Sequence, residues 1–132
     1  MIHVYWDKHA KRKLVVRMDY TDPVATWGEY YRAVEKAHAM VASRDPVSGT
    51  VIHNAGSTRM PPGNPFPHID RAISTAPDNL TLVYMVISNP IARRMTEIGL
   101  RINPATHQHP ARYIFVHSID EAYRRIESIL QP

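Results

Sequence analysis

The strongest constraint on the fold is a near-continuous apolar run, LTLVYMVIS, at residues 80–88. A strand with one solvent-exposed face alternates apolar and polar side chains, whereas a strand covered on both faces is apolar throughout. The run is also far shorter than the roughly 18 apolar residues that a membrane-spanning helix needs. It therefore predicts the central strand of a sheet that lies between helices, and we expect no membrane span.

Shorter strands and helical patterns surround this run. Alternating apolar residues at 2–6 and 14–18 predict a β-hairpin, and apolar residues at helical spacing predict the helices. The other predicted elements are a helix from Thr26 to before Asp45, a strand at 50–53, a helix from Phe66 to before Pro77, a helix at 90–102, a strand at 112–116 and a helix from Ile119. Strands that alternate with helices require right-handed crossovers.

The fold class that follows is α/β. We expect one domain over residues 1–132, with a single mixed, mostly parallel five-stranded sheet, an N-terminal β-hairpin and about four helices. Such a chain buries enough apolar surface to fold without a disulfide or a metal. In such sheets, ligands bind at the carboxyl ends of the strands.

Composition narrows the function classes. The chain has no cysteine, which excludes thiol nucleophiles, disulfides and thiolate metal sites. Its N-terminus lacks an apolar segment behind a basic start, so we expect a cytoplasmic protein. The formal net charge is +4, but the basic residues are dispersed. The small cluster of Lys8 and residues 11–13 is typical of a solvated hairpin turn, and we do not expect nucleic-acid binding.

The junction after the central strand allows three interpretations. Ser88 or Asn89 suits a helix N-cap, with Pro90 at the first helical position. Free backbone N–H groups there, together with Arg93 and Arg94, would instead form an anion or partner site. The third interpretation is a small hydrolase or transferase that uses Ser88 with His53 or His117, although no nucleophile motif is present. We favour the cap, then the anion or partner site.

Other residues suggest weaker hypotheses. The stripe formed by Ile91, Met95, Ile98 and Ile102 is expected to face the core, and His38 to be packed and hydrogen-bonded. The pair His107 and His109 does not complete a metal site, so no metal or other cofactor is expected. Crowding of Trp27, Tyr30 and Tyr31 predicts an exposed ring, which would suit a homodimer. A lipid-binding protein, with methionines lining a cleft, is a further alternative.

The last third of the chain carries a family resemblance. ISNPIARRMTEIGL and YIFVHSIDEAYRRI resemble the C-terminal part of STAS domains, and the opening strand, VYWD at Val4–Asp7, resembles that of small stand-alone bacterial STAS-like proteins. The matching residues are Ser88, Pro90, Arg93, Arg94, Gly99, Leu100, Phe115, Ser118, Glu121 and Ala122. The chain is thus identified as a STAS-like (SpoIIAA-like) member of the anti-sigma-factor antagonist superfamily.

This resemblance implies a non-catalytic regulatory module. STAS domains bind a partner protein or a small ligand, and in partner-switching members a phosphorylated serine at the start of the second helix controls docking. That position here reads Pro61-Pro62-Gly63, so the switch serine is absent, and Ser57 and Thr58 are the nearby candidates for phosphorylation. We expect a protein partner or a small anionic ligand at Ser57, Thr58, Arg59, Ser88, Asn89, Arg93 and Arg94.

Overall fold

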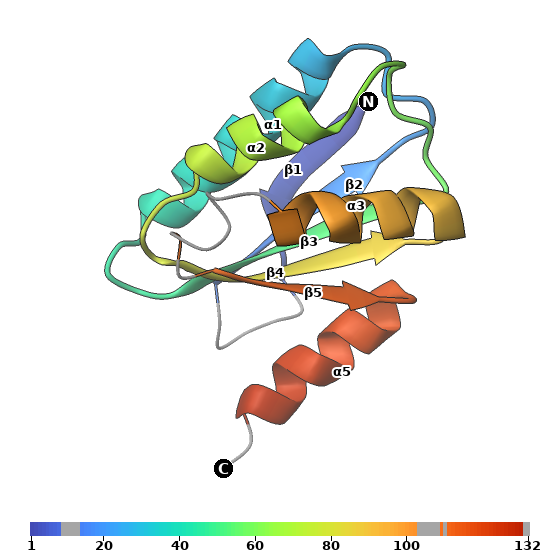
Figure 1. The fold of residues 1–132 in the computed structure, drawn as a ribbon. Helices are drawn as coiled ribbons and strands as arrows, with labels where there is room; N and C mark the ends of the chain where they lie inside the picture. The colour runs from blue at the N-terminus through green and yellow to red at the C-terminus, as the bar shows by residue number, and fades with distance from the viewer. Residues whose placement is uncertain (9–13, 103–108, 110, 131–132) are drawn as a thin grey trace.

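The protein is an α/β sandwich in which helices lie on both faces of one sheet (Figure 1). The structure, a computed structural model, describes residues 1–8, 14–102, 109 and 111–130. The strands are β1 (Ile2–Trp6), β2 (Leu14–Tyr20), β3 (Gly49–Gly56), β4 (Leu80–Ile87) and β5 (Arg112–Val116). The helices are α1 (Trp27–Ala42), α2 (Phe66–Ser74), α3 (Pro90–Ile102) and α5 (Ile119–Leu130). Within these described residues, no helix is both long enough and apolar enough to cross a membrane.

The sheet confirms the predicted fold class. Its five strands lie in the order β1-β2-β3-β4-β5. β1 pairs with β2 antiparallel, as the predicted hairpin requires, and each later pair is parallel. The apolar run becomes β4, which has a strand neighbour on each side and is covered on both faces. Short strands and right-handed crossovers therefore produce the mixed sheet that the pattern of elements predicts.

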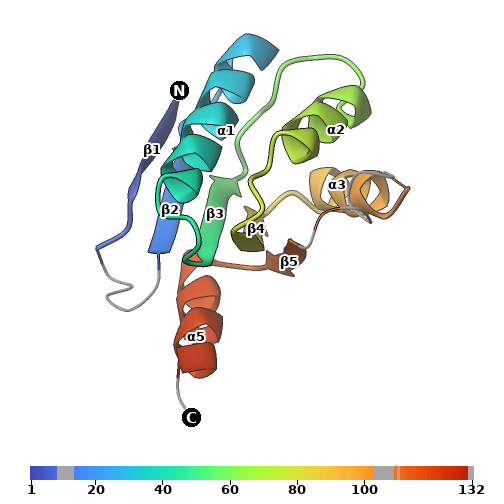
Figure 2. The same ribbon diagram turned by 90° about the vertical axis from the view of Figure 1, so that its left-hand side faces the viewer.

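The two faces of the sheet carry different helices. Figures 1 and 2 show α1, α2 and α3 on one face and α5 alone on the other. Under α1, the core contains Val16, Met18, Val34, Val51 and Val83. Under α5, it contains Val15, Ile52, Tyr84, Ala122 and Ile126. Neighbouring residues of one strand enter opposite cores, as the two-residue period of a strand requires.

Helix starts follow the predicted capping chemistry. Thr26 Oγ1 accepts a hydrogen bond from the N–H of Glu29, and Ser118 Oγ accepts one from the N–H of Glu121. Pro65 is the N-cap residue of α2, and Asn64 Oδ1 accepts from the N–H of Phe66. These contacts satisfy N–H groups that have no partner within the helix.

Three sequence expectations need correction. β3 extends to Gly56 rather than ending at residue 53, because its last residues continue to pair with β4 through an irregular register. No ring of the α1 aromatics is fully exposed: Trp27 stacks on His68 of α2 with ring centroids 4.0 Å apart. The prediction of a buried stripe on α3 is also wrong, since Ile91 is 73% exposed and Ile102 63%.

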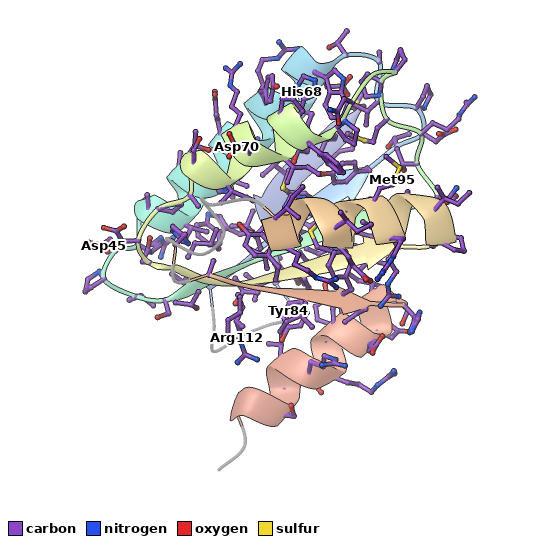
Figure 3. The ribbon with its side chains drawn as sticks, in the orientation of Figure 1. Asp45, His68, Asp70, Tyr84, Met95 and Arg112 are labelled. Atoms are coloured by element: carbon purple, nitrogen blue, oxygen red, sulfur yellow. The ribbon has the colours of Figure 1, made fainter. Side chains whose placement is uncertain are left out.

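The outward direction of the apolar stripe on α3 has a steric cause. Gly99 lies against Phe66 of α2, and a Cβ atom at Gly99 would come within 3.0 Å of Phe66 Cδ1. This close approach fixes the rotation of α3 about its axis. Thr96 and Leu100 consequently face the interior, and Met95 points away from the sheet (Figure 3).

Candidate functional site at the start of helix α3

Two loops meet at the carboxyl edge of the sheet. One connects β3 to α2, and the other connects β4 to α3. The N–H of Ser88 donates a 2.7 Å hydrogen bond to the carbonyl of Gly56, which joins the two loops directly. The sequence-predicted residues Ser57 and Ser88 therefore lie on neighbouring segments, as the expected position at the ends of parallel strands requires.

The cap of α3 is Asn89. Its Oδ1 accepts hydrogen bonds from the N–H groups of Ile91 (2.9 Å) and Ala92 (3.1 Å), and Pro90 occupies the first helical position. This confirms the capped-helix interpretation. It also contradicts the expectation that free backbone N–H groups are available here for an anion, because the cap occupies these two.

A surface pocket of about 490 Å³ opens beside this helix start. It is lined by Ile87, Ser88, Pro90, Arg93, Arg94, Glu97 and His117. Two guanidinium groups and an imidazole thus surround one carboxylate. Among the sequence-predicted residues, Ser88, Arg93 and Arg94 come together in the pocket wall, and Asn89 contributes only the cap.

Arg93 is the more enclosed of the two arginines in the pocket. Its Nε lies 3.2 Å from Glu97 Oε1, and its Nη1 lies 3.1 Å from Nδ1 of His117. The guanidinium carbon also lies 5.7 Å from the centroid of the Phe115 ring, within cation–π range. Arg94 is more exposed and contacts Glu97 at 3.6 Å. Arg94 can therefore reorient toward an incoming carboxylate at low cost, since exposed ion pairs contribute little.

The β3–α2 loop places its three predicted residues in different environments. Ser57 is exposed, and the N–H of Thr58 donates to the carbonyl of Ala55 at 3.0 Å. Arg59 binds Asp22 through its backbone N–H, Nε and Nη2. This contact lowers the pKa of Asp22. Arg59 is thus exposed but already paired with a carboxylate, whereas Ser57 is exposed at the turn itself.

The residues of the catalytic alternative do not assemble. Ser88 and His117 line the same pocket, but neither His117 nor His53 forms a hydrogen bond with Ser88 in the described structure. His53 instead lies under α1 on the inner face of β3, where its Nδ1 is 2.8 Å from the hydroxyl oxygen of Tyr20. A serine nucleophile needs a base within hydrogen-bond reach.

Two further histidines, His38 and His109, serve in packing. Nδ1 of His38 lies 2.9 Å from Thr75 Oγ1, which confirms the expected packed and hydrogen-bonded residue. Both ring nitrogens of His109 have partners, the Pro77 carbonyl and the Ala111 N–H. His107 and the basic residues 11–13 lie outside the described residues. No group of three or more potential metal ligands occurs in the part of the chain that the structure describes.

The exposed apolar stripe of α3 is a functional feature that the sequence pattern alone did not identify. Ile91, Met95 and Ile102 are all exposed, and they lie on one side of the helix that begins at the pocket. The helical spacing of the apolar residues revealed the stripe, but it did not reveal whether the stripe faces the core or the solvent. Gly99, four residues after Met95, flanks the stripe and is the position where a neighbouring helix can approach closely.

Comparison with known proteins does not relate this site to a family. The chain matches no protein-family model, no curated protein and no solved structure at a significant level.

Proposed function

We propose that this protein is a STAS-like, non-catalytic regulatory module that binds a protein partner through the outer surface of α3. The observation that carries the proposal is the exposed stripe of Ile91, Met95 and Ile102. Large aliphatic side chains aligned on one exposed helix face are characteristic of protein-interaction sites. The stripe extends over three helical turns, roughly 16 Å at 1.5 Å per residue.

The charges around the stripe define the partner's chemistry. Arg93 and Arg94 lie at its N-terminal end, beside the 490 Å³ pocket, and Arg101 lies near its other end. We infer a partner segment that is apolar on one side and carries carboxylates on its flank. One carboxylate would enter the pocket and bind Arg94, while apolar side chains cover the stripe. A small free anion in the same pocket is the secondary candidate, supported by the same arginines.

Phosphorylation of Ser57 would regulate this contact. Ser57 is exposed and follows Gly56, whose carbonyl binds Ser88 of the pocket. A phosphate there would place negative charge beside the arginines that the partner needs, and we expect it to weaken docking. Thr58 is the less favourable acceptor because it is partly buried and its backbone N–H holds the turn.

The test compares partner capture by matched variants. Immobilised wild-type protein, Met95→Glu and Val47→Glu are exposed to extract from the source cells, and the affinity of each for the captured protein is then measured. Val47 is an exposed hydrophobic residue away from α3, so Val47→Glu controls for an added charge. We expect Met95→Glu to bind at least tenfold more weakly and Val47→Glu to bind like the wild type.

A second pair of variants tests the pocket. Arg94→Glu should weaken the complex and reduce its salt dependence, whereas Arg124→Glu on the exposed side of α5 should not. Native mass spectrometry reports subunit number and covalent phosphate in the same samples. Equal capture by wild type and Met95→Glu would rule out α3 as the docking surface. A homodimer that Met95→Glu dissociates would show that a second copy covers the stripe instead.

A further inference from the structure

Two small cavities, both partly open to solvent, lie between the sheet and the three helices above it. The smaller has a volume of about 40 Å³ and the larger about 100 Å³. They adjoin, because Tyr30, Ile69, Met85 and Thr96 line both. The larger cavity reaches the loop before α2, at Met60 and Pro65, which marks the direction of entry.

Several polar side chains of this mostly apolar lining lack a full set of partners among the described residues, namely His53 and the hydroxyls of Tyr30 and Tyr113. His53 is 8% exposed and lines the smaller cavity. Its Nδ1 is bonded to the hydroxyl of Tyr20, whereas its Nε2 has no hydrogen-bond partner among the described residues. Among the described residues, the Tyr84 hydroxyl is the fully buried side-chain group without a partner, so Nε2 of His53 retains access to the cavity, where water or a ligand can bond to it. The cavity thus presents a hydrogen-bonding atom to whatever occupies it.

The hydrogen bond to Tyr20 indicates which role Nε2 plays. A phenolic hydroxyl is a better donor than acceptor, and the Tyr20 hydroxyl has this one partner in the described structure. If it donates to Nδ1, the imidazole proton resides on Nε2. Nε2 then donates into the cavity, and a ligand that binds to it needs an oxygen atom that accepts this hydrogen bond.

The walls carry no charge near neutral pH. Burial lowers the pKa of His53 to about 3 and that of His38 to about 4, and it raises the pKa values of Tyr20, Tyr30 and Tyr113, so both imidazoles and all three phenols remain neutral. Among the described residues, no Asp, Glu, Lys or Arg lines either cavity. An ionised ligand would be buried without a counter-charge, which is strongly unfavourable.

We propose that these cavities form a binding site for a small uncharged aromatic molecule with one oxygen acceptor. The ring occupies the larger cavity against Tyr30 and Met85, and the oxygen accepts a hydrogen bond from Nε2 of His53. Aromatic walls and a methionine thioether suit a ring. The larger cavity alone is smaller than the cavity of about 150 Å³ that holds benzene, but the two adjoining cavities together approach that volume, and the flexible Met85 can move to enlarge them. A long acyl chain does not fit in these volumes.

The ligand site is separate from the docking surface. Thr96 and Leu100 line the cavities from the inner side of α3, while Met95 lies on the outer side. The methyl groups of Met85 and Met95 therefore report on the two sites independently. Both can be observed in a methyl NMR spectrum of protein labelled at methionine.

The experiment titrates the whole protein with three probes of similar size: acetophenone, ethylbenzene and benzoate. Acetophenone has the ring and the acceptor, ethylbenzene lacks the acceptor, and benzoate is charged. We expect acetophenone to shift the Met85 methyl signal saturably and leave that of Met95 unchanged. Ethylbenzene should bind about tenfold more weakly because it lacks one hydrogen bond, and benzoate should not shift Met85.

Two variants localise the binding. Ala55→Leu places a larger side chain in the larger cavity and should weaken acetophenone binding at least tenfold. The double variant His53→Leu/Tyr20→Phe removes both hydrogen-bonding partners together and should abolish the preference for acetophenone over ethylbenzene. If Ala55→Leu fails to fold, the proposal is tested by whether the double variant loses the preference for acetophenone over ethylbenzene.

Three results would overturn the proposal. These are the absence of a Met85 shift up to the solubility limit of acetophenone, equal shifts of Met85 and Met95, and a preference for acetophenone that survives in the double variant.

Discussion

Nη1 of Arg93 lies 3.1 Å from Nδ1 of His117, so a helix residue and the residue that follows β5 are joined across the pocket. A guanidinium group can only donate hydrogen bonds. Nδ1 must therefore be the acceptor, and neutral His117 carries its proton on Nε2. The contact keeps Arg93 in the pocket wall, beside the candidate partner site.

The first prediction concerns this tautomer. Nitrogen-15 spectra of the imidazole side chains should show neutral His117 protonated at Nε2. Replacement of Arg93 by Gln removes the cationic donor and should give a mixture of the two tautomers. Asn89→Ala is not a suitable control because it removes the cap, so Arg124→Gln on α5 serves instead. Observation of the Nδ1–H tautomer in the wild type would contradict the Arg93 contact.

The second prediction uses two glycines that differ in the space around them. A Cβ atom at Gly49 would lie 2.5 Å from Val41 Cγ1, whereas one at Gly28 would lie 3.3 Å from the movable Nη1 of Arg32. Gly49→Ala should therefore lower the free energy of unfolding by about 1–3 kcal/mol. Gly28→Ala, inside α1, should raise it by up to about 1 kcal/mol. Urea unfolding measures both, and equal effects would contradict the steric argument.

The third prediction concerns a buried hydroxyl. Tyr84 is fully buried on the side of the sheet that α5 covers (Figure 3), and its hydroxyl has no hydrogen-bond partner in the described part of the chain. Tyr84→Phe removes an unsatisfied polar atom and should raise the free energy of unfolding by about 1 kcal/mol.

Tyr20→Phe is the matched comparison for Tyr84→Phe. The Tyr20 hydroxyl is bonded to His53, so its removal leaves Nδ1 of the buried imidazole without a partner and should destabilise the protein. Opposite signs for the two Tyr→Phe substitutions support the hydrogen-bond assignment. A loss of stability in Tyr84→Phe would indicate that its hydroxyl is satisfied in solution.

The fourth prediction is a loss of stability on acidification. The pKa of His53 is lowered from 6.5 to about 3 by burial, so the unfolded chain binds a proton that the folded protein excludes. The stability contribution of neutral His53 is complete above pH 6.5 and is lost as the pH falls toward the folded pKa. Between these two pKa values, the free energy of unfolding falls by about 1.4 kcal/mol for each pH unit of acidification.

Urea unfolding at neutral pH and at about pH 5 measures this slope. The double variant His53→Leu/Tyr20→Phe should show a smaller slope than the wild type. It retains part of the effect, because burial also lowers the pKa of His38, to about 4. Parallel pH profiles for the two proteins would show that His53 does not contribute to the acid sensitivity.

Local chemistry made several elements predictable. The uninterrupted apolar run of β4 required cover on both faces, and Asn89-Pro90 and Ser118 required helix starts, because each rule depends on a few neighbouring residues. The alternation of strands and helices then predicted a single mixed, mostly parallel sheet, but it did not determine the strand order. The site residues Ser88, Arg93 and Arg94 were found for the same reason, since they surround a helix start at the end of a parallel strand.

Contacts between distant elements determined the features that the sequence did not predict. The sequence by itself determined most strand and helix positions and the capped start of α3, because the spacing of apolar residues and helix capping are local properties. Only the tertiary structure decided that the α3 stripe faces outward, since the approach of Gly99 to Phe66 fixes the helix rotation. It also decided that His53 is buried beside a cavity, because β3, α1 and α2 enclose that volume only after they pack together.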